Sequence, residues 1–131
     1  MRAAFLSDSD GLIDVLRQDP VAASELERLL RHGRVGVNII TRLELVVGSR
    51  DKQALHRTEQ LLSSWELALL NESISEIADG LVTNYYLSHG VLIADALIAA
   101  TALYHDLPFL SKNQRHFRFI PGLKLLPYPK A

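Results

Sequence analysis

Short apolar segments alternate with helical segments along the whole chain. Segments typical of strands cover residues 3–7, 35–40, 66–70, 109–110 and 124–126, and helical patterns separate them. Strands joined by helices form a parallel sheet with right-handed crossovers and with helices on both faces. The sequence therefore predicts an α/β fold, a three-layer α/β/α arrangement with a central parallel sheet of four to five strands.

Helices are expected over residues 12–16, 21–31, 41–47, 52–64, 73–88 and 94–105. Two of them begin with a capping-box pattern, Thr41 with Glu44 and Ser73 with Glu76. In this pattern the hydroxyl and the carboxylate satisfy backbone amides reciprocally, so each pattern predicts the start of a helix. The helix at 94–105 has so few polar residues that we expect it to be buried.

The size and composition are those of one globular domain. A chain of 131 residues can bury a core without disulfides or structural metal, so we expect a single domain over residues 1–131. A net charge of −1 argues against an extended surface that coats nucleic acid. The chain has no cysteine, which excludes disulfides and thiolate zinc sites and fits a cytoplasmic protein. The N-terminus lacks a signal-peptide pattern, and no stretch approaches the roughly 20 apolar residues of a membrane span.

Three acidic residues lie next to or within apolar segments, where carboxylates are unusual. Asp8 and Glu44 follow predicted strands, and Asp95 lies in the longest apolar stretch. A carboxylate among apolar residues costs free energy unless it is paired or binds a cation. In open α/β sheets, ligands bind beyond the carboxyl ends of the strands, and there we expect these three side chains to meet Asn113. Carboxylate oxygens suit a hard divalent metal.

Several of these residues also have a simpler structural explanation. Asp8 fits a helix N-cap, Glu44 fits a capping box, and Asn113 fits a polar turn. Asp95 is the hardest to explain in this way, because a cap does not need an apolar helix around it. A metal site and local capping therefore both remain open for Asp8 and Glu44.

A small basic cluster follows the fourth predicted strand and consists of Lys112, Arg115 and Arg118. Such clusters are usually solvated surface. If the acids hold a metal, Lys112 and Arg115 lie where a phosphate backbone would need contacts. His116 is interpreted as a packed or hydrogen-bonded residue, and no histidine is expected next to the acids. The five histidines include no pair with the spacing of a zinc site.

Four segments carry motifs that match one known family in order and in spacing. They are residues 8–14, 40–45, 94–103 and 107–117, with the sequences DSDGLID, ITRLEL, ADALIAATAL and LPFLSKNQRHF. These segments resemble the motifs of the PIN domain, and most closely those of VapC-type toxins, over nearly the whole chain. The first motif departs from the family pattern at Asp10, where asparagine is common, and at Gly11, where a larger apolar residue is common.

The resemblance implies a metal-dependent endoribonuclease that hydrolyses RNA phosphodiester bonds with Mg²⁺ or Mn²⁺. Carried over by position, Asp8, Glu44 and Asp95 are the metal ligands and catalytic acids. Asn113 falls where many relatives have a fourth acid. The resemblance also implies a PIN-like fold, a cognate antitoxin as a partner, and a homodimer.

Three other functions remain open. The chain can be a PIN-like module without catalysis that only binds RNA or a protein. The segment 8–11 also resembles the nucleophile loop of haloacid-dehalogenase-type phosphatases, but that class needs a later acidic pair and Asp95 stands alone. A receiver-type signalling domain needs an aspartate at the end of the third strand, and the segment 67–71 offers none.

Overall fold

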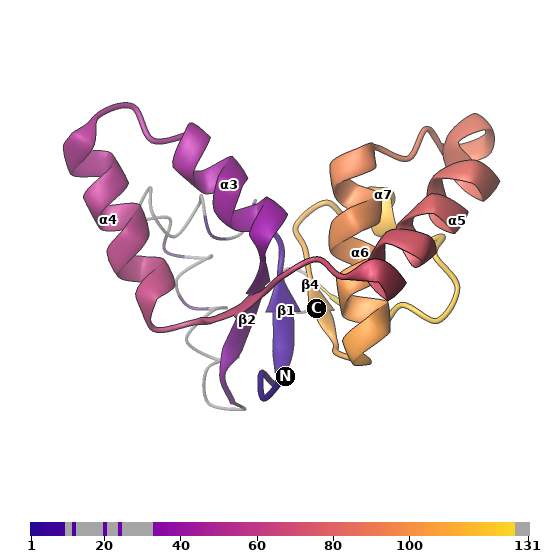
Figure 1. Ribbon diagram of the computed structural model, residues 1–131, viewed down its shortest axis with the longest axis horizontal. Helices are drawn as coiled ribbons and strands as arrows, with labels where there is room; N and C mark the ends of the chain where they lie inside the picture. Colours follow the sequence, from indigo (N-terminus) through magenta and orange to yellow (C-terminus); the bar gives the residue numbers. More distant parts are fainter. Residues whose placement is uncertain (10–11, 13–19, 21–23, 25–32, 128–131) are drawn as a thin grey trace.

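The computed structural model describes residues 1–9, 12, 20, 24 and 33–127 (Figure 1). The helices expected over 12–16 and 21–31 fall almost wholly outside these residues, as do Asp10 and Gly11. In the part of the chain that is described, no helix is long and apolar enough to cross a membrane.

The described residues form a sheet of five parallel strands in the order β3-β2-β1-β4-β5. The strands are β1 (Phe5–Ser7), β2 (Val35–Asn38), β3 (Glu66–Ala68), β4 (Phe109–Leu110) and β5 (Leu125–Leu126). In the central strand, Leu6 pairs with Gly36 on one side and with Phe109 on the other. The predicted parallel sheet is confirmed. Because all strands run the same way, their C-terminal ends share one side of the sheet, which we call the carboxyl edge.

Helices flank the sheet on two sides, with α3 and α4 on one side and α5, α6 and α7 on the other (Figure 1). Their bounds are α3 (Ile39–Val47), α4 (Lys52–Ser63), α5 (Glu72–His89), α6 (Ile93–His105) and α7 (Gln114–Phe117). The helices expected at 41–47, 52–64, 73–88 and 94–105 are therefore confirmed, with small shifts at their ends. The short α7 was not expected, because four residues are too few to show a helical pattern.

The capping box predicted at the start of α3 is wrong. The side-chain carbonyl of Asn38 accepts a hydrogen bond from the Ile40 backbone N–H at 2.6 Å, and the helix therefore begins at Ile39. Thr41 lies inside the first turn instead of before it. Thr41 is fully buried, and its Oγ1 has no hydrogen-bond partner among the described residues.

The second predicted capping box is wrong for the same reason. Asn71 accepts a hydrogen bond from the Ile74 backbone N–H at 2.8 Å, so α5 begins before Ser73. The end of α5 is as expected. It stops at His89, and Gly90 follows with φ 62°, a left-handed conformation that glycine adopts without strain.

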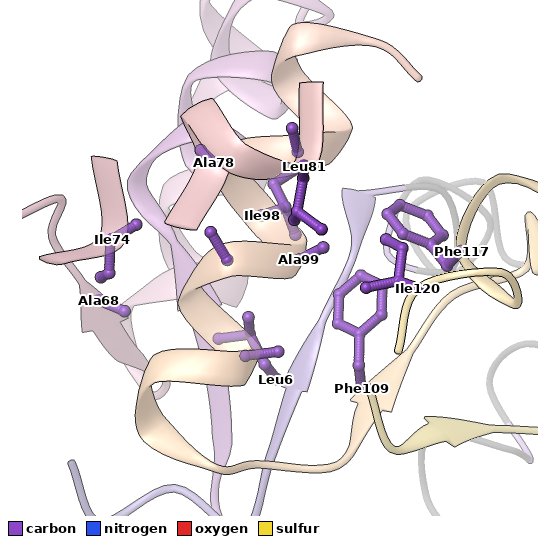
Figure 2. Close-up of a cluster of buried hydrophobic side chains, with 13 residues drawn as sticks. Leu6, Ala68, Ile74, Ala78, Leu81, Ile98, Ala99, Phe109, Phe117 and Ile120 are labelled. Carbon is purple, nitrogen blue, oxygen red and sulfur yellow. The ribbon is translucent and has the colours of Figure 1, made fainter. Parts of the chain in front are cut away.

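The main core lies between the sheet and the pair α5–α6 (Figure 2). Its fully buried large side chains are Leu6, Ile74, Ile98, Phe109 and Phe117. Phe5 packs on the opposite face of the sheet, because successive side chains along a strand point to opposite faces. The predicted burial of α6 is confirmed, and this helix carries Asp95 in its first turn.

Candidate active site

Asp8 lies at the carboxyl edge, directly after the central strand. It is 4% exposed, and its backbone N–H donates to the Leu110 carbonyl at 2.8 Å. Its carboxylate accepts hydrogen bonds at both oxygens: the Ser9 backbone N–H lies 2.7 Å from Oδ1, and Ser111 Oγ lies 3.0 Å from Oδ2. The side chain is thus held by the ends of both β1 and β4.

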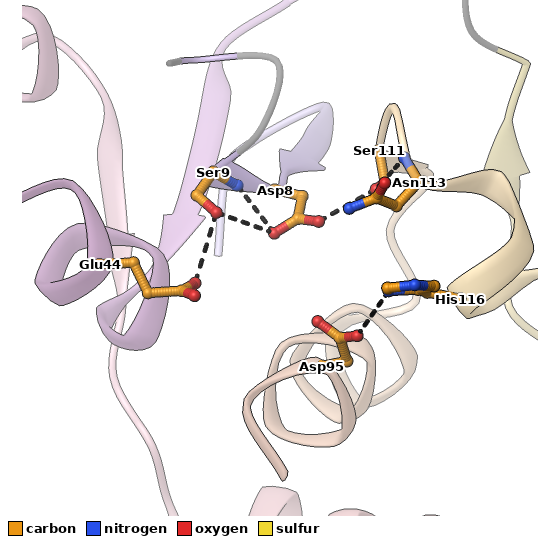
Figure 3. A network of polar contacts seen from close by, with 7 residues as sticks. All are labelled: Asp8, Ser9, Glu44, Asp95, Ser111, Asn113 and His116. Carbon is orange, nitrogen blue, oxygen red and sulfur yellow. Dashed lines mark hydrogen bonds and ion pairs between the residues drawn. The ribbon is translucent and has the colours of Figure 1, made fainter. Parts of the chain in front are cut away.

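Glu44 reaches the same edge from the second turn of α3 (Figure 3). The residue is exposed. Ser9 connects it to Asp8, since Ser9 Oγ lies 3.4 Å from Glu44 Oε1 and 3.5 Å from Asp8 Oδ1. The capping role considered for Glu44 does not occur, because Asn38 occupies the cap position of this helix.

Asp95 lies in the first turn of α6 and is held by a histidine. Its Oδ2 is 3.1 Å from Nδ1 of His116, which belongs to α7. The Asp95 side chain is 16% exposed and the His116 side chain is 46% exposed, so the acid is the more buried partner of this contact. The prediction that His116 is a hydrogen-bonded residue is confirmed. The expectation that no histidine lies next to the acids is wrong.

Ser111 and Asn113 continue the carboxyl edge after β4. Ser111 is fully buried, and its Oγ accepts a hydrogen bond from the Asn113 backbone N–H at 3.1 Å while it donates to Asp8. Asn113 is exposed and directly precedes α7. In Figure 3 it lies beside Ser111, near Asp8.

The carboxylates of Asp8, Glu44 and Asp95 point toward a common region in Figure 3, each from a different element. Among the residues that the structure describes, no three Asp, Glu or His side chains come close enough to hold a metal ion by themselves. Their oxygen donors nevertheless fit a hard cation such as Mg²⁺, which keeps several waters and needs few protein ligands. Asp10, a further acid of the first motif, lies outside the described residues.

The basic residues predicted to contact RNA border this region. Lys112 and Arg115 are both exposed. Arg115 lines a pocket of about 220 Å³ together with Asp95 and His116. Positive charge therefore lies close to the α6 side of the candidate site.

Sequence reasoning missed the polar residues that hold the acids in place. Ser9 and Ser111 bind Asp8, as described above. Asn38, the last residue of β2 and the N-cap of α3, is fully buried and contacts α6, because its Nδ2 donates to Thr101 Oγ1 at 2.6 Å. Thr101 Oγ1 in turn donates to the Leu97 carbonyl at 2.8 Å. A polar residue inside an apolar segment was the available signal for both Asn38 and Thr101.

Known proteins resemble this chain in sequence and in fold. Ribonuclease VapC19 of Mycobacterium tuberculosis is 36% identical over 121 residues, which are 91% of this chain and 96% of that protein. A toxin–antitoxin complex from Klebsiella pneumoniae superposes with a TM-score of 0.77 at 26% identity, over 94% of this chain and 96% of that one. VapBC2 from Rickettsia felis, bound to a DNA fragment from its promoter, has the same fold, with a TM-score of 0.79 at 22% identity over 93% and 96% of the two chains.

A family model agrees with these similarities. The model of the PIN domain matches residues 6–122, so it includes all four candidate site residues from Asp8 to Asn113. A match of this extent excludes the phosphatase and receiver alternatives, which have other folds. The chain belongs to the PIN-domain family.

Proposed function

We propose that this protein is a VapC-type toxin, a metal-dependent endoribonuclease that hydrolyses RNA phosphodiester bonds, and that residues 1–131 act as a single domain. The observation that carries the proposal is the position of three acids from separate segments, Asp8, Glu44 and Asp95, at one edge of the sheet. The similarity to a protein named Ribonuclease VapC19 supports the same activity.

In the proposed mechanism, Asp8, Glu44 and Asp95 are the residues that would hold Mg²⁺ or Mn²⁺. When bound, such an ion lowers the pKa of a coordinated water and stabilises charge on the scissile phosphate. No side-chain nucleophile is required, in agreement with the absence of cysteine from the chain.

The surrounding residues keep the acids in position before RNA binds. Ser111 and the Ser9 backbone fix the Asp8 carboxylate through bonds of 3.0 and 2.7 Å. His116 fixes Asp95 from α7. Preorganised groups reduce the rearrangement needed at the moment of reaction. Asn113 adds a neutral polar group at the same edge.

Lys112 and Arg115 are proposed to bind phosphates that flank the cleaved bond. Both are exposed cations, and Arg115 lies in the same pocket wall as Asp95. Contacts of lysine and arginine to phosphate position a nucleic acid without reading its sequence. These two residues would therefore align the RNA strand across the acids.

We further propose a cognate antitoxin as a protein partner, a homodimeric state and a cytoplasmic location. The antitoxin is supported by the neighbour from Klebsiella pneumoniae, which is a toxin–antitoxin complex. It is also supported by exposed apolar side chains on α3 next to the candidate site: Leu43 is 50% exposed and Val47 is 85% exposed. Large exposed apolar groups are typical of surfaces that a partner covers.

The first experiment is RNA cleavage by the purified protein in Mg²⁺, in Mn²⁺ and in EDTA, with Asp95→Asn beside the wild type. This substitution keeps the shape of the side chain and removes its charge. We expect cleavage that depends on metal and falls by at least about 100-fold in the variant, since residues that only support metal ligands already contribute 10- to 100-fold. Asp79→Asn, in an exposed part of α5, is the matched control and should keep full activity.

Two outcomes would contradict the proposal. Equal cleavage by the wild type and Asp95→Asn would remove Asp95 from the site. No cleavage of a broad RNA panel in either metal would favour the PIN-like module that binds without catalysis.

A further inference from the structure

Asp95 borders a pocket, and part of the pocket wall, His89–Leu92, has no role in the proposed mechanism. Its volume is about 220 Å³, and its walls are formed by His89–Leu92, Asp95, Arg115 and His116. The first of these segments is the end of α5 and the loop that leads into α6. Drug-sized ligands occupy pockets of about 300–1,000 Å³, so this smaller space suits a single ring system.

Both histidines in the wall are held by other residues. The ring of His89 stacks on Phe119 with centroids 4.1 Å apart and planes 13° from parallel, and its Nδ1 lies 2.7 Å from Ser88 Oγ. His116 is held by Asp95 at 3.1 Å. Because these rings are already positioned, a ligand would lose little affinity in ordering them.

The space next to His89 is open. A Cβ atom added to Gly90 would meet no atom within 4 Å, and φ at this glycine is 62°. The left-handed conformation turns the chain sharply after α5, and Val91 and Leu92 then form the wall between His89 and Asp95. The pocket therefore combines an apolar stretch with imidazole and guanidinium groups.

We propose that this pocket binds the nucleobase of one nucleotide next to the scissile phosphate. The inference rests on the proposed ribonuclease function and assigns to the same site a subsite for a base. Proteins bind exposed RNA bases by stacking them on histidine or on arginine planes and by hydrogen bonds to the base edges. His89 and His116 supply such rings, while Arg115 keeps its proposed contact with a flanking phosphate.

A base suits the pocket better than a phosphate does. The wall carries the Arg115 guanidinium but also the Asp95 carboxylate, which would repel a phosphate placed inside. A neutral heterocycle meets no such repulsion. With a base in the pocket, the phosphate attached to its nucleotide would remain near Asp95 and the other acids.

The test is a set of RNAs in which each nucleotide around the cleaved bond is replaced, one at a time, by an abasic residue. We expect one flanking position to lower kcat/KM by about 5- to 150-fold, the range measured for the loss of one base contact on an aromatic side chain. His89→Ala should lower cleavage of the intact RNA and cause little additional loss with that abasic RNA. His89→Phe, which keeps a flat ring, should retain part of the base dependence.

His56→Ala is the matched control, because His56 is an exposed histidine on α4 that does not line the pocket. It should leave the abasic profile unchanged. Binding of the same RNAs in EDTA, followed by fluorescence anisotropy, is a second measurement that does not require cleavage. The abasic position that lowers kcat/KM should also be the one that lowers the affinity for RNA.

Equal kcat/KM and equal affinity for all abasic RNAs would overturn the base pocket. So would independent, additive losses from His89→Ala and the abasic position. If Asp95→Asn still abolishes cleavage in that case, only the pocket is wrong and the ribonuclease proposal stands. If Asp95→Asn cleaves like the wild type, the proposed function itself fails.

Discussion

The two helices that carry Glu44 and Asp95 face the same site but are held in different ways. In α6, six residues are buried, from Ala96 to Ala102, and the helix is part of the main core. In α3, only Thr41 and Leu45 are buried. Asp95 is therefore positioned by a largely buried helix and by His116, whereas Glu44 lies on a less buried helix and contacts Ser9. The candidate site thus combines one acid on a firmly packed helix with another on a helix that is less buried.

The substitution Glu44→Gln is expected to have the largest effect, and it tests whether both helices contribute to activity. We expect it to lower kcat/KM by at least about 100-fold, as for Asp95→Asn, because both changes remove a proposed hard ligand of the metal. The measurement is RNA cleavage over a range of Mn²⁺ concentrations. Near-normal activity of Glu44→Gln would mean that only the α6 side of the site contributes, and the comparison would lose its functional meaning.

The next test compares core substitutions in the two helices. Ile98→Ala and Leu45→Ala each create a cavity, and such changes cost about 2–5 kcal/mol of unfolding free energy. Ile98 lies in the larger cluster and is 1% exposed, so we expect its loss to fall in the upper part of that range and that of Leu45 in the lower part. Urea denaturation measures both.

Leu43→Ala is the control for these core substitutions. Leu43 is 50% exposed on α3, and its replacement should change stability by no more than about 0.5 kcal/mol. A cost for Leu45→Ala that equals or exceeds that for Ile98→Ala would show that α3 is packed as firmly as α6.

The smallest effects are expected for substitutions of two buried threonines, Thr101 and Thr58, which each donate a hydrogen bond to the backbone carbonyl four residues earlier. Thr101 Oγ1 donates to the carbonyl four residues earlier and accepts from Asn38, while Thr58 Oγ1 donates to the Ala54 carbonyl and bonds Ser49. Thr101→Val and Thr58→Val should each cost about 1–3 kcal/mol, because each leaves a polar partner unsatisfied. Only Thr101→Val breaks the contact between Asn38, the N-cap of α3, and α6.

We therefore expect Thr101→Val, and not Thr58→Val, to raise the metal concentration needed for half-maximal cleavage, by about 10-fold. Thr101→Ser, which keeps the hydroxyl, should restore the wild-type value. Equal metal dependence in the two valine variants would show that the Asn38–Thr101 bond stabilises the fold without positioning the acids.

The sequence predicted the sheet and the edge on which the acids lie, because both follow from the order of strands and helices. It did not predict the helix starts, since Asn38 and Thr41 are both good caps locally and the end of β2 decides between them. Nor did it predict the bond from His116 to Asp95, which are 21 residues apart. That contact depends on how α7 packs, and α7 is too short to leave a pattern.

The central position of β1 has a consequence for the protein while it is being synthesised. Asp8 is synthesised about a hundred residues before Leu110, which its backbone bonds, and Ser111, which bonds its carboxylate. In the same way, Asp95 is synthesised 21 residues before His116, the residue that it contacts. A nascent chain that ends before these residues therefore lacks the contacts that hold both acids of the candidate site.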